Sequence, residues 1–150
     1  MGGKVEAIWT KPATGGVMEA AERATLVEAQ GMEGDVNFGR KARQVTVIET
    51  EVFDRLRAEL PDASPVMRRA NIMVSGISLE HSRDKLLTLG DVKIRLRGET
   101  HPCEQMDEQC PGLRSALDVH WGGGAHGVVV QGGELHLGDV ATIEAPVAVG

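Results

Sequence analysis

Glycine is the residue that most constrains what this chain can fold into. Nineteen of its 150 residues are glycine, a share well above the average of about 7% in globular proteins. The glycines do not form a linker but separate short runs in which apolar and polar residues alternate. Because glycine adopts positive φ without steric cost, this distribution predicts short strands joined by tight turns.

Seven segments have the period of two, or the β-branched content, that is typical of a β-strand. They are residues 5–9, 44–48, 71–77, 91–97, 128–131, 134–137 and 140–144. The last three are separated by Gly132-Gly133 and Gly138-Asp139, which predict hairpins and therefore an antiparallel meander. Because closing a sheet removes its exposed edges, we expect a mainly β, bent, barrel-like single domain over residues 1–150.

A few short helices interrupt the strands in this prediction. Apolar residues recur at helical spacing over residues 50–60 and a proline follows them, which predicts a helix there. A shorter helix is expected over residues 102–109, followed by a further turn with Leu113 and Leu117 on one side.

The composition excludes several classes of partner. The chain has 16 Lys and Arg against 22 Asp and Glu, a net charge of −6, and only two Trp, two Phe and no Tyr. The negative charge disfavours phosphate backbones and anionic lipid, and few aromatic rings are present to stack single-stranded bases. No apolar stretch approaches the roughly 20 residues that span a bilayer, and no signal-peptide core follows Met1. We therefore expect a cytoplasmic protein with reduced cysteines that binds neither nucleic acid nor membrane.

Cys103 is the candidate for chemistry. Pro102 suits the first position of a helix, so Cys103 would lie in the first turn, where free backbone N–H groups favour a thiolate. His101 would add to this effect if its ring pointed inward, whereas four nearby carboxylates would oppose ionisation of the thiol. The alternative, from the residues alone, is a small buried cysteine under a helix. For Cys110 a structural role is expected, because it precedes Pro111 at a helix end, where the dipole disfavours a thiolate.

Basic residues gather in three places on this acidic chain. They are Arg40, Lys41 and Arg43, then Arg68 and Arg69, and then Lys93, Arg95 and Arg97. The first two groups precede strands, and because a guanidinium grips phosphate with two hydrogen bonds, they are candidates for an anion cradle. The third group alternates with apolar residues and is expected on a solvated outer face. The two cysteines and five histidines fit no zinc-binding spacing.

Ten short segments of the chain together resemble a known family. They are residues 31–35 (GMEGD), 43–48 (RQVTVI), 69–72 (RANI), 75–77 (SGI), 89–91 (LGD), 102–106 (PCEQM), 111–113 (PGL), 122–123 (GG), 132–133 (GG) and 137–139 (LGD). In this order and at this spacing, the chain resembles the MOSC domain family over residues of about 31–143, as a small stand-alone member of bacterial type. The family is named for the C-terminal domain of molybdenum cofactor sulfurase.

The resemblance implies a fold and a site. Members of the family have a bent, β-rich barrel, and several bind the molybdenum cofactor, a pterin that carries a dithiolene and a phosphate. The family's cysteine, whose thiolate ligates molybdenum in those members, falls on Cys103. Arg69 and Asn71 match an Arg-x-Asn element that would hold the phosphate or the pterin edge, and Arg43 is a further candidate for the same anion. His101 is a cofactor-binding candidate too, and it stands where some reductases of the family carry a small or hydroxyl residue.

Three functions fit the resemblance. Some members reduce N-hydroxylated compounds at molybdenum, others are thought to carry sulfur, and a third option is a module that binds the cofactor without catalysis. A thiolate suits the chemistry as a soft ligand for molybdenum or as the acceptor of a persulfide sulfur. Longer relatives carry a ferredoxin-like extension or a separate β-barrel domain that does not follow Gly150 here. The expected partners are therefore a separate electron-donor reductase or a sulfur-donating desulfurase, with a small molecule as substrate.

Overall fold

The computed structural model describes residues 3–13, 16–101, 106, 108 and 110–144 of the chain. Of these residues 41% are in strands and 13% in helices. The prediction of a mainly β fold is therefore confirmed. Among the described residues, no helix is both long and apolar enough to cross a membrane.

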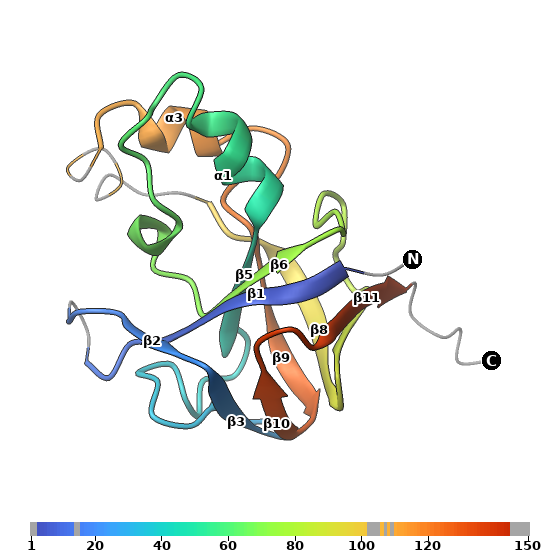
Figure 1. Ribbon diagram of the computed structural model, residues 1–150. Helices are drawn as coiled ribbons and strands as arrows, with labels where there is room; N and C mark the ends of the chain where they lie inside the picture. The colour runs from blue at the N-terminus through green and yellow to red at the C-terminus, as the bar shows by residue number, and fades with distance from the viewer. Residues whose placement is uncertain (1–2, 14–15, 102–105, 107, 109, 145–150) are drawn as a thin grey trace.

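Seven strands close into a barrel (Figure 1). In chain order they are β1 (Gly3–Thr10), β5 (Val45–Glu49), β6 (Ile72–Ser75), β7 (Leu86–Leu89), β8 (Val92–Glu99), β9 (Ala125–Gln131) and β11 (Val140–Glu144). Around the barrel the order is β1-β6-β5-β9-β8-β7-β11, and β11 pairs back onto β1 through Gly3 opposite Ala141. The bent barrel expected from the short alternating segments is thus observed, with β7 as a strand that the alternation did not reveal.

A smaller sheet lies beside the barrel. It contains β10 (Gly133–His136), β3 (Arg23–Val27) and β4 (Gly31–Met32), while β2 (Glu19–Ala21) pairs with the end of β1. The pairing of β10 with β3 shows that the predicted meander of the last three strands was wrong. A Cβ on Gly132 would collide with the carbonyl oxygen of Leu26, so this glycine serves a close approach to β3 and not the predicted hairpin. Leu137, which follows β10, is exposed.

The one parallel pair among the described strands, β5 with β6, determines where the helices lie. Parallel neighbours need a crossover connection, and here it contains α1 (Thr50–Leu56) and the 3-10 helix η1 (Pro65–Arg68). The helix predicted over 50–60 is confirmed in place and is shorter, because turns follow Leu56. α3 (Leu113–Leu117) packs beside α1 at one end of the barrel (Figure 1). The helix predicted over 102–109 lies mostly outside the described residues.

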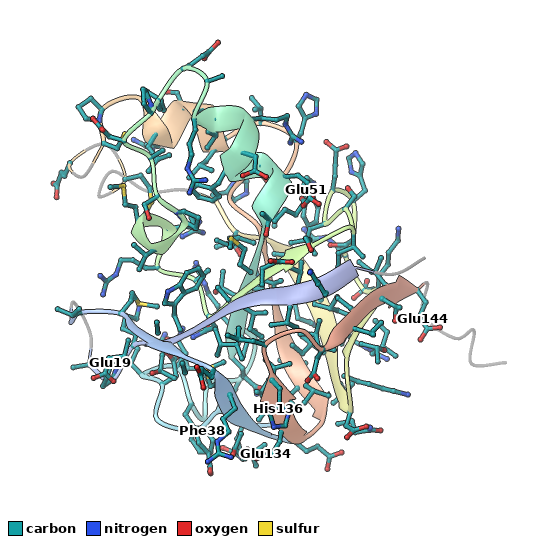
Figure 2. All side chains as sticks on the ribbon, in the orientation of Figure 1. Glu19, Phe38, Glu51, Glu134, His136 and Glu144 are labelled. Atoms are coloured by element: carbon teal, nitrogen blue, oxygen red, sulfur yellow. The ribbon has the colours of Figure 1, made fainter. Side chains whose placement is uncertain are left out.

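The core has two parts that share strand β5. Val47 packs in the aliphatic barrel interior, whereas its neighbour Ile48 points to the other face and packs with Phe53 and Leu113 beneath the helices. All five residues of β5 are buried, because both faces of the strand are covered. On β8, in contrast, the apolar residues are buried and alternate with Lys93, Arg95 and Arg97, which confirms the expected outer face of that strand. His136 of β10 is exposed (Figure 2).

Candidate functional site

A basic cavity of about 260 Å³ is the candidate site. Its described lining residues are Lys11, Asn37, Arg40, Arg43, Thr46, Arg68, Arg69 and Met106. Five of these side chains are cationic and none of the described ones is a carboxylate. On a chain of net charge −6, this is a local concentration of positive charge that suits an anion.

The strand directions explain why these segments meet. β5 and β6 are parallel, so the residues before both strands lie at the same end of the barrel. β1 is antiparallel to β6, so the residues that follow β1 reach that end as well. Lys11 comes after β1, Arg43 precedes β5, and Arg69 precedes β6. The topology therefore gathers cations that are far apart in the sequence.

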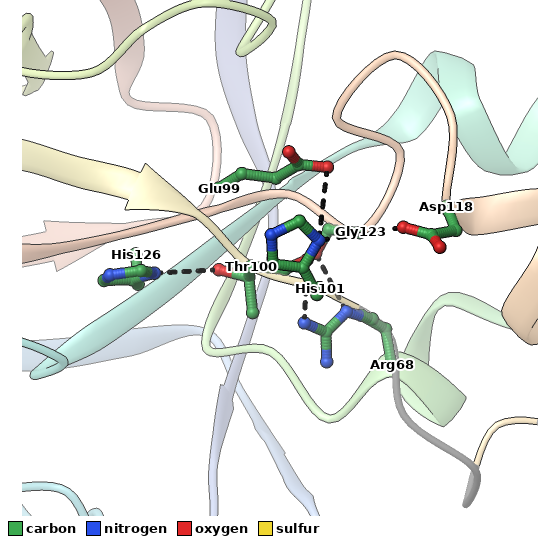
Figure 3. Close-up of polar contacts among 7 residues, drawn as sticks. All are labelled: Arg68, Glu99, Thr100, His101, Asp118, Gly123 and His126. Atoms are coloured by element: carbon green, nitrogen blue, oxygen red, sulfur yellow. Dashed lines mark hydrogen bonds and ion pairs between the residues drawn. The ribbon is translucent and has the colours of Figure 1, made fainter.

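Arg68 and Arg69 leave the end of η1 in different directions. Arg69 has a φ of 60°, which is in the left-handed region, and its Nη2 donates to the carbonyl oxygen of Gly16. Arg68 is buried, and its Nε donates to the carbonyl oxygen of Gly123 at 2.8 Å while Nη2 donates to that of Thr100 at 3.4 Å (Figure 3). One arginine thus ties the cavity to the loop after β1, and the other ties it to the end of β8.

The pKa of Lys11 reflects the positive charge of the cavity. Burial lowers the pKa of its ammonium group, and the positive charges of Arg69, Arg43 and Arg40 lower this pKa further, while the carboxylate of Asp35 raises it. The cations therefore repel one another in the free protein. An anion in the cavity would relieve this repulsion and favour the charged form of Lys11.

The predicted cofactor-binding residues separate into three groups. Arg43 and Arg69 line the cavity. Asn71 does not belong to the described lining, since it is 3% exposed and its Oδ1 accepts the backbone N–H of Thr46. His101 lies on the surface, where its Nδ1 is 3.9 Å from Oε2 of Glu99 and 3.7 Å from Oδ1 of Asp118 (Figure 3).

These three surface residues have side chains that can ligate a metal. The donor atoms of Glu99, His101 and Asp118 lie within 4.8 Å of one another. The His101 side chain is 72% exposed and that of Asp118 is 58% exposed. Exposed acidic groups commonly lie beside a histidine without holding a metal ion, and this arrangement adds nothing to the basic cavity.

Cys103 lies outside the described residues, whereas Thr100, three residues before it, and Met106, three residues after it, are described. Thr100 accepts the hydrogen bond from Arg68, which lines the cavity, and its own N–H donates to Gly124. On the other side, Met106 is buried and lines the cavity itself. Cys110 is also buried and packs in the second core cluster, with its N–H bonded to the carbonyl oxygen of Met106.

Sequence reasoning identified the arginines of the cavity and missed Lys11, Asn37 and Thr46. Arginine pairs before a strand are a visible pattern. A single lysine after a strand, an asparagine in a loop and a threonine in a buried strand are common in any fold. Nothing in their local sequence distinguishes them, because their role arises from residues that are distant in the chain.

Comparison with known proteins places this geometry in context. The MOSC domain model matches residues 33–142. The chain matches no curated protein sequence. Among solved structures, YuaD protein from Bacillus subtilis superposes with a TM-score of 0.84 at 20% identity, covering 97% of each chain. YiiM from Escherichia coli gives 0.72 at 16% identity, covering 99% of this chain and 72% of that one. YiiM from Geobacillus stearothermophilus gives 0.70 at 14% identity, covering 95% and 75%. At these identities the likeness shows the fold alone.

Proposed function

The chain belongs to the MOSC domain family, and from this membership we propose that it binds the molybdenum cofactor. In this proposal the phosphate of the cofactor occupies the basic cavity and the thiolate of Cys103 ligates molybdenum. The observation that carries the proposal is the cavity itself, where five cationic side chains converge and Met106, three residues after the cysteine in the sequence, forms part of the wall.

The chemistry of the cavity fits a phosphate. Guanidinium groups bind phosphate oxygens with paired, charge-assisted hydrogen bonds, and Arg43 and Arg69 both line the cavity. The lowered pKa of Lys11 supports the same ligand, because burial and neighbouring arginines disfavour its charge until an anion is present. The described residues therefore suit the phosphate end of the cofactor.

The size of the cavity fits one group of a larger ligand. Sites that enclose a whole drug-sized ligand usually have volumes of about 300–1,000 Å³, whereas this cavity has about 260 Å³. It is thus suited to a phosphate and not to a complete pterin.

The assignment of the thiolate rests on sequence position and on the burial of the other cysteine. Cys103 lies three residues before Met106, which lines the cavity, and a chain spans three residues in at most about 11 Å. Cys110 is 5% exposed in the second core cluster and is not available as a ligand. A thiolate needs reducing conditions, so we propose the cytoplasm as the place where the protein works.

The bound cofactor would supply two-electron redox chemistry at molybdenum. We propose that the reaction is reduction of an N-hydroxylated compound. The N–O bond breaks, two electrons from a separate reductase and two protons are taken up, and the amine form and water leave. The residues of this chain hold the cofactor: the cavity binds its phosphate and Cys103 fixes the metal.

The first test is metal content. The protein is expressed with a supply of cofactor, and molybdenum is measured by mass spectrometry in the wild type and in variants C103S, R43Q and R69Q. We expect about one molybdenum per wild-type chain, none in C103S and less in both arginine variants. R95Q, which removes an arginine from the outer face of β8, is the matched control and should retain the metal.

The second test separates the three functions that fit the family. Turnover of an N-hydroxylated base with a chemical reductant supports the reductase, and molybdenum without turnover indicates a binding module. A wild-type protein without molybdenum but with one extra sulfur atom on Cys103 would replace the proposal with the sulfur-carrier function.

A further inference from the structure

We infer that Asp35 and Asn71 are a pair of positioning residues that order the basic cavity for its anion. The inference rests on the proposed function, because it concerns the same cavity. The inference goes beyond the proposed function because it gives Asn71, which matches the family's Arg-x-Asn element, a role in ordering the cavity wall and not in contacting the ligand. The pair is buried, with 6% of Asp35 and 3% of Asn71 exposed.

The carboxylate of Asp35 holds two segments of the cavity wall. Its Oδ1 accepts the backbone N–H of Lys11 at 2.8 Å, and its Oδ2 accepts that of Asn37 at 3.0 Å. Both Lys11 and Asn37 line the cavity. The loop after β1 and the loop after β4 are therefore fixed to one buried carboxylate.

The amide of Asn71 connects this carboxylate to the barrel. Its Nδ2 donates to Oδ1 of Asp35 at 3.0 Å and to the carbonyl oxygen of Trp9 at 3.3 Å. Its Oδ1 accepts the backbone N–H of Thr46, a third lining residue, at 3.0 Å. Both ends of the amide are bonded to the protein, and Asn71 is not among the described residues that line the cavity.

Three lining residues are thus held through their backbone N–H groups by one hydrogen-bonded pair. Lys11, Asn37 and Thr46 all line the cavity and belong to three segments that are separated in the sequence. The repulsion among the cations tends to open the cavity, and Asp35 opposes it by charge as well as by its hydrogen bonds. Preorganisation of this kind strengthens binding, since the ligand does not have to order the loops.

The variant D35N distinguishes positioning from a simple effect of charge. If Asp35 acted only as a nearby negative charge, its removal would make the cavity more positive and tighten anion binding. If it positions the wall, D35N loosens binding, because an amide group cannot accept all three of the N–H groups that the carboxylate accepts. The sign of the change therefore decides the question.

The experiment measures the dissociation constant of inorganic phosphate by calorimetry, well below the melting temperature of each variant. We expect D35N and N71D each to weaken binding about tenfold, the effect of roughly one buried hydrogen bond. The double variant D35N/N71D exchanges acid and amide across the pair, and it should recover part of the loss. E49Q is the matched control: Glu49 is a buried carboxylate that accepts the N–H of Leu79 and does not line the cavity. It should bind phosphate as the wild type does.

The arginine variant R43Q separates failure of this inference from failure of the proposed function. If R43Q loses phosphate while D35N binds it as tightly as the wild type or more tightly, the inference is overturned and the proposed function stands. If the wild type binds phosphate no more tightly than R43Q, the proposed function falls and the inference with it.

Amide hydrogen exchange of the wild type provides a second measurement that needs no variant. The amides of Lys11, Asn37 and Thr46 should open as one unit, and phosphate should slow their exchange by a common factor. The amide of Leu79, bonded to Glu49, should not respond to phosphate. Exchange at the three amides that is unaffected by phosphate would overturn the inference even if D35N or N71D fails to fold.

Discussion

Arg68 and Gly123 are joined by a hydrogen bond of 2.8 Å from Nε to the carbonyl oxygen, although 55 residues separate them in the sequence. The same guanidinium donates to the carbonyl oxygen of Thr100, three residues before Cys103 (Figure 3). Arg68 therefore links the end of η1, the glycine-rich turn before β9 and the end of β8. Arg68 stabilises the wall of the cavity through Gly123 and Thr100, whereas Arg69 bonds to Gly16 in the loop after β1.

Replacement of Arg68 by glutamine should lower the free energy of unfolding by about 3 kcal/mol, because two buried carbonyl oxygens lose a charged donor. Urea denaturation measures this value. R95Q is the control, since Arg95 is exposed on β8, and it should change stability by less than about 0.5 kcal/mol. Equal effects of the two substitutions would show that the buried hydrogen bonds of Arg68 contribute nothing.

The two cysteines should differ in reactivity. Cys110 is 5% exposed in the core beneath the helices, so a thiol reagent should modify one cysteine per native chain and two after unfolding. C103S should abolish the reaction of the native protein, while C110S should preserve it and lower stability by about 1–2 kcal/mol, because a hydroxyl replaces a buried thiol. Reaction of native C103S at the rate of the wild type would contradict the assignment.

Lys11 should make stability depend on pH in the alkaline range. Burial and the charges of Arg69, Arg43 and Arg40 lower its pKa in the folded state below the ordinary value of 10.5. As pH rises through the lowered pKa, the folded state releases a proton that the unfolded state retains, so stability increases until 10.5 is reached. The free energy of unfolding of the wild type should therefore rise relative to that of K11M over this interval. If the difference in unfolding free energy between the wild type and K11M stays constant with pH, the pKa of Lys11 is not lowered in the folded state.

Gly124 should be intolerant of a side chain. Its φ is +92°, and a Cβ there would collide with the carbonyl oxygen of Val47. G124A should cost about 3 kcal/mol or more, which thermal unfolding would detect as a large drop in melting temperature. Gly138 has a similar φ of +86°, and no atom lies within 4 Å of the position that a Cβ would take there, so G138A should cost only about 1–2 kcal/mol for the backbone conformation. Similar losses in both variants would mean that the collision is relieved by movement of β5.

The local pattern of the chain determined much of the fold. Alternation on β8 assigned Val92, Ile94 and Leu96 to the interior and the intervening basic residues to the outer face, as observed. Gly34, Gly39, Gly90 and Gly138 lie in turns as predicted, whereas Gly98 and Gly127 lie inside strands. Helical spacing placed α1. These properties depend on residues that are neighbours in the sequence, so the sequence reports them directly.

Strand partners and the wall of the cavity were decided by the tertiary structure. The break between β9 and β10 at Gly132 is visible in the sequence, but the choice of β3 as the partner of β10 is not, because β3 is a strand about 110 residues earlier in the chain. In the same way, the patterns suggested the arginines as an anion cradle, while Lys11 joins them through the pairing of β1 with β6 and a hydrogen bond to Asp35, 24 residues away. Backbone conformation is dictated largely by adjacent residues. Strand pairing and cavity formation depend instead on which surfaces, distant in the sequence, pack together with the lowest free energy. For this chain the sequence alone determined the closed β architecture and its family, and the folding of three separated loops onto Asp35 and Asn71 decided the shape of its candidate site.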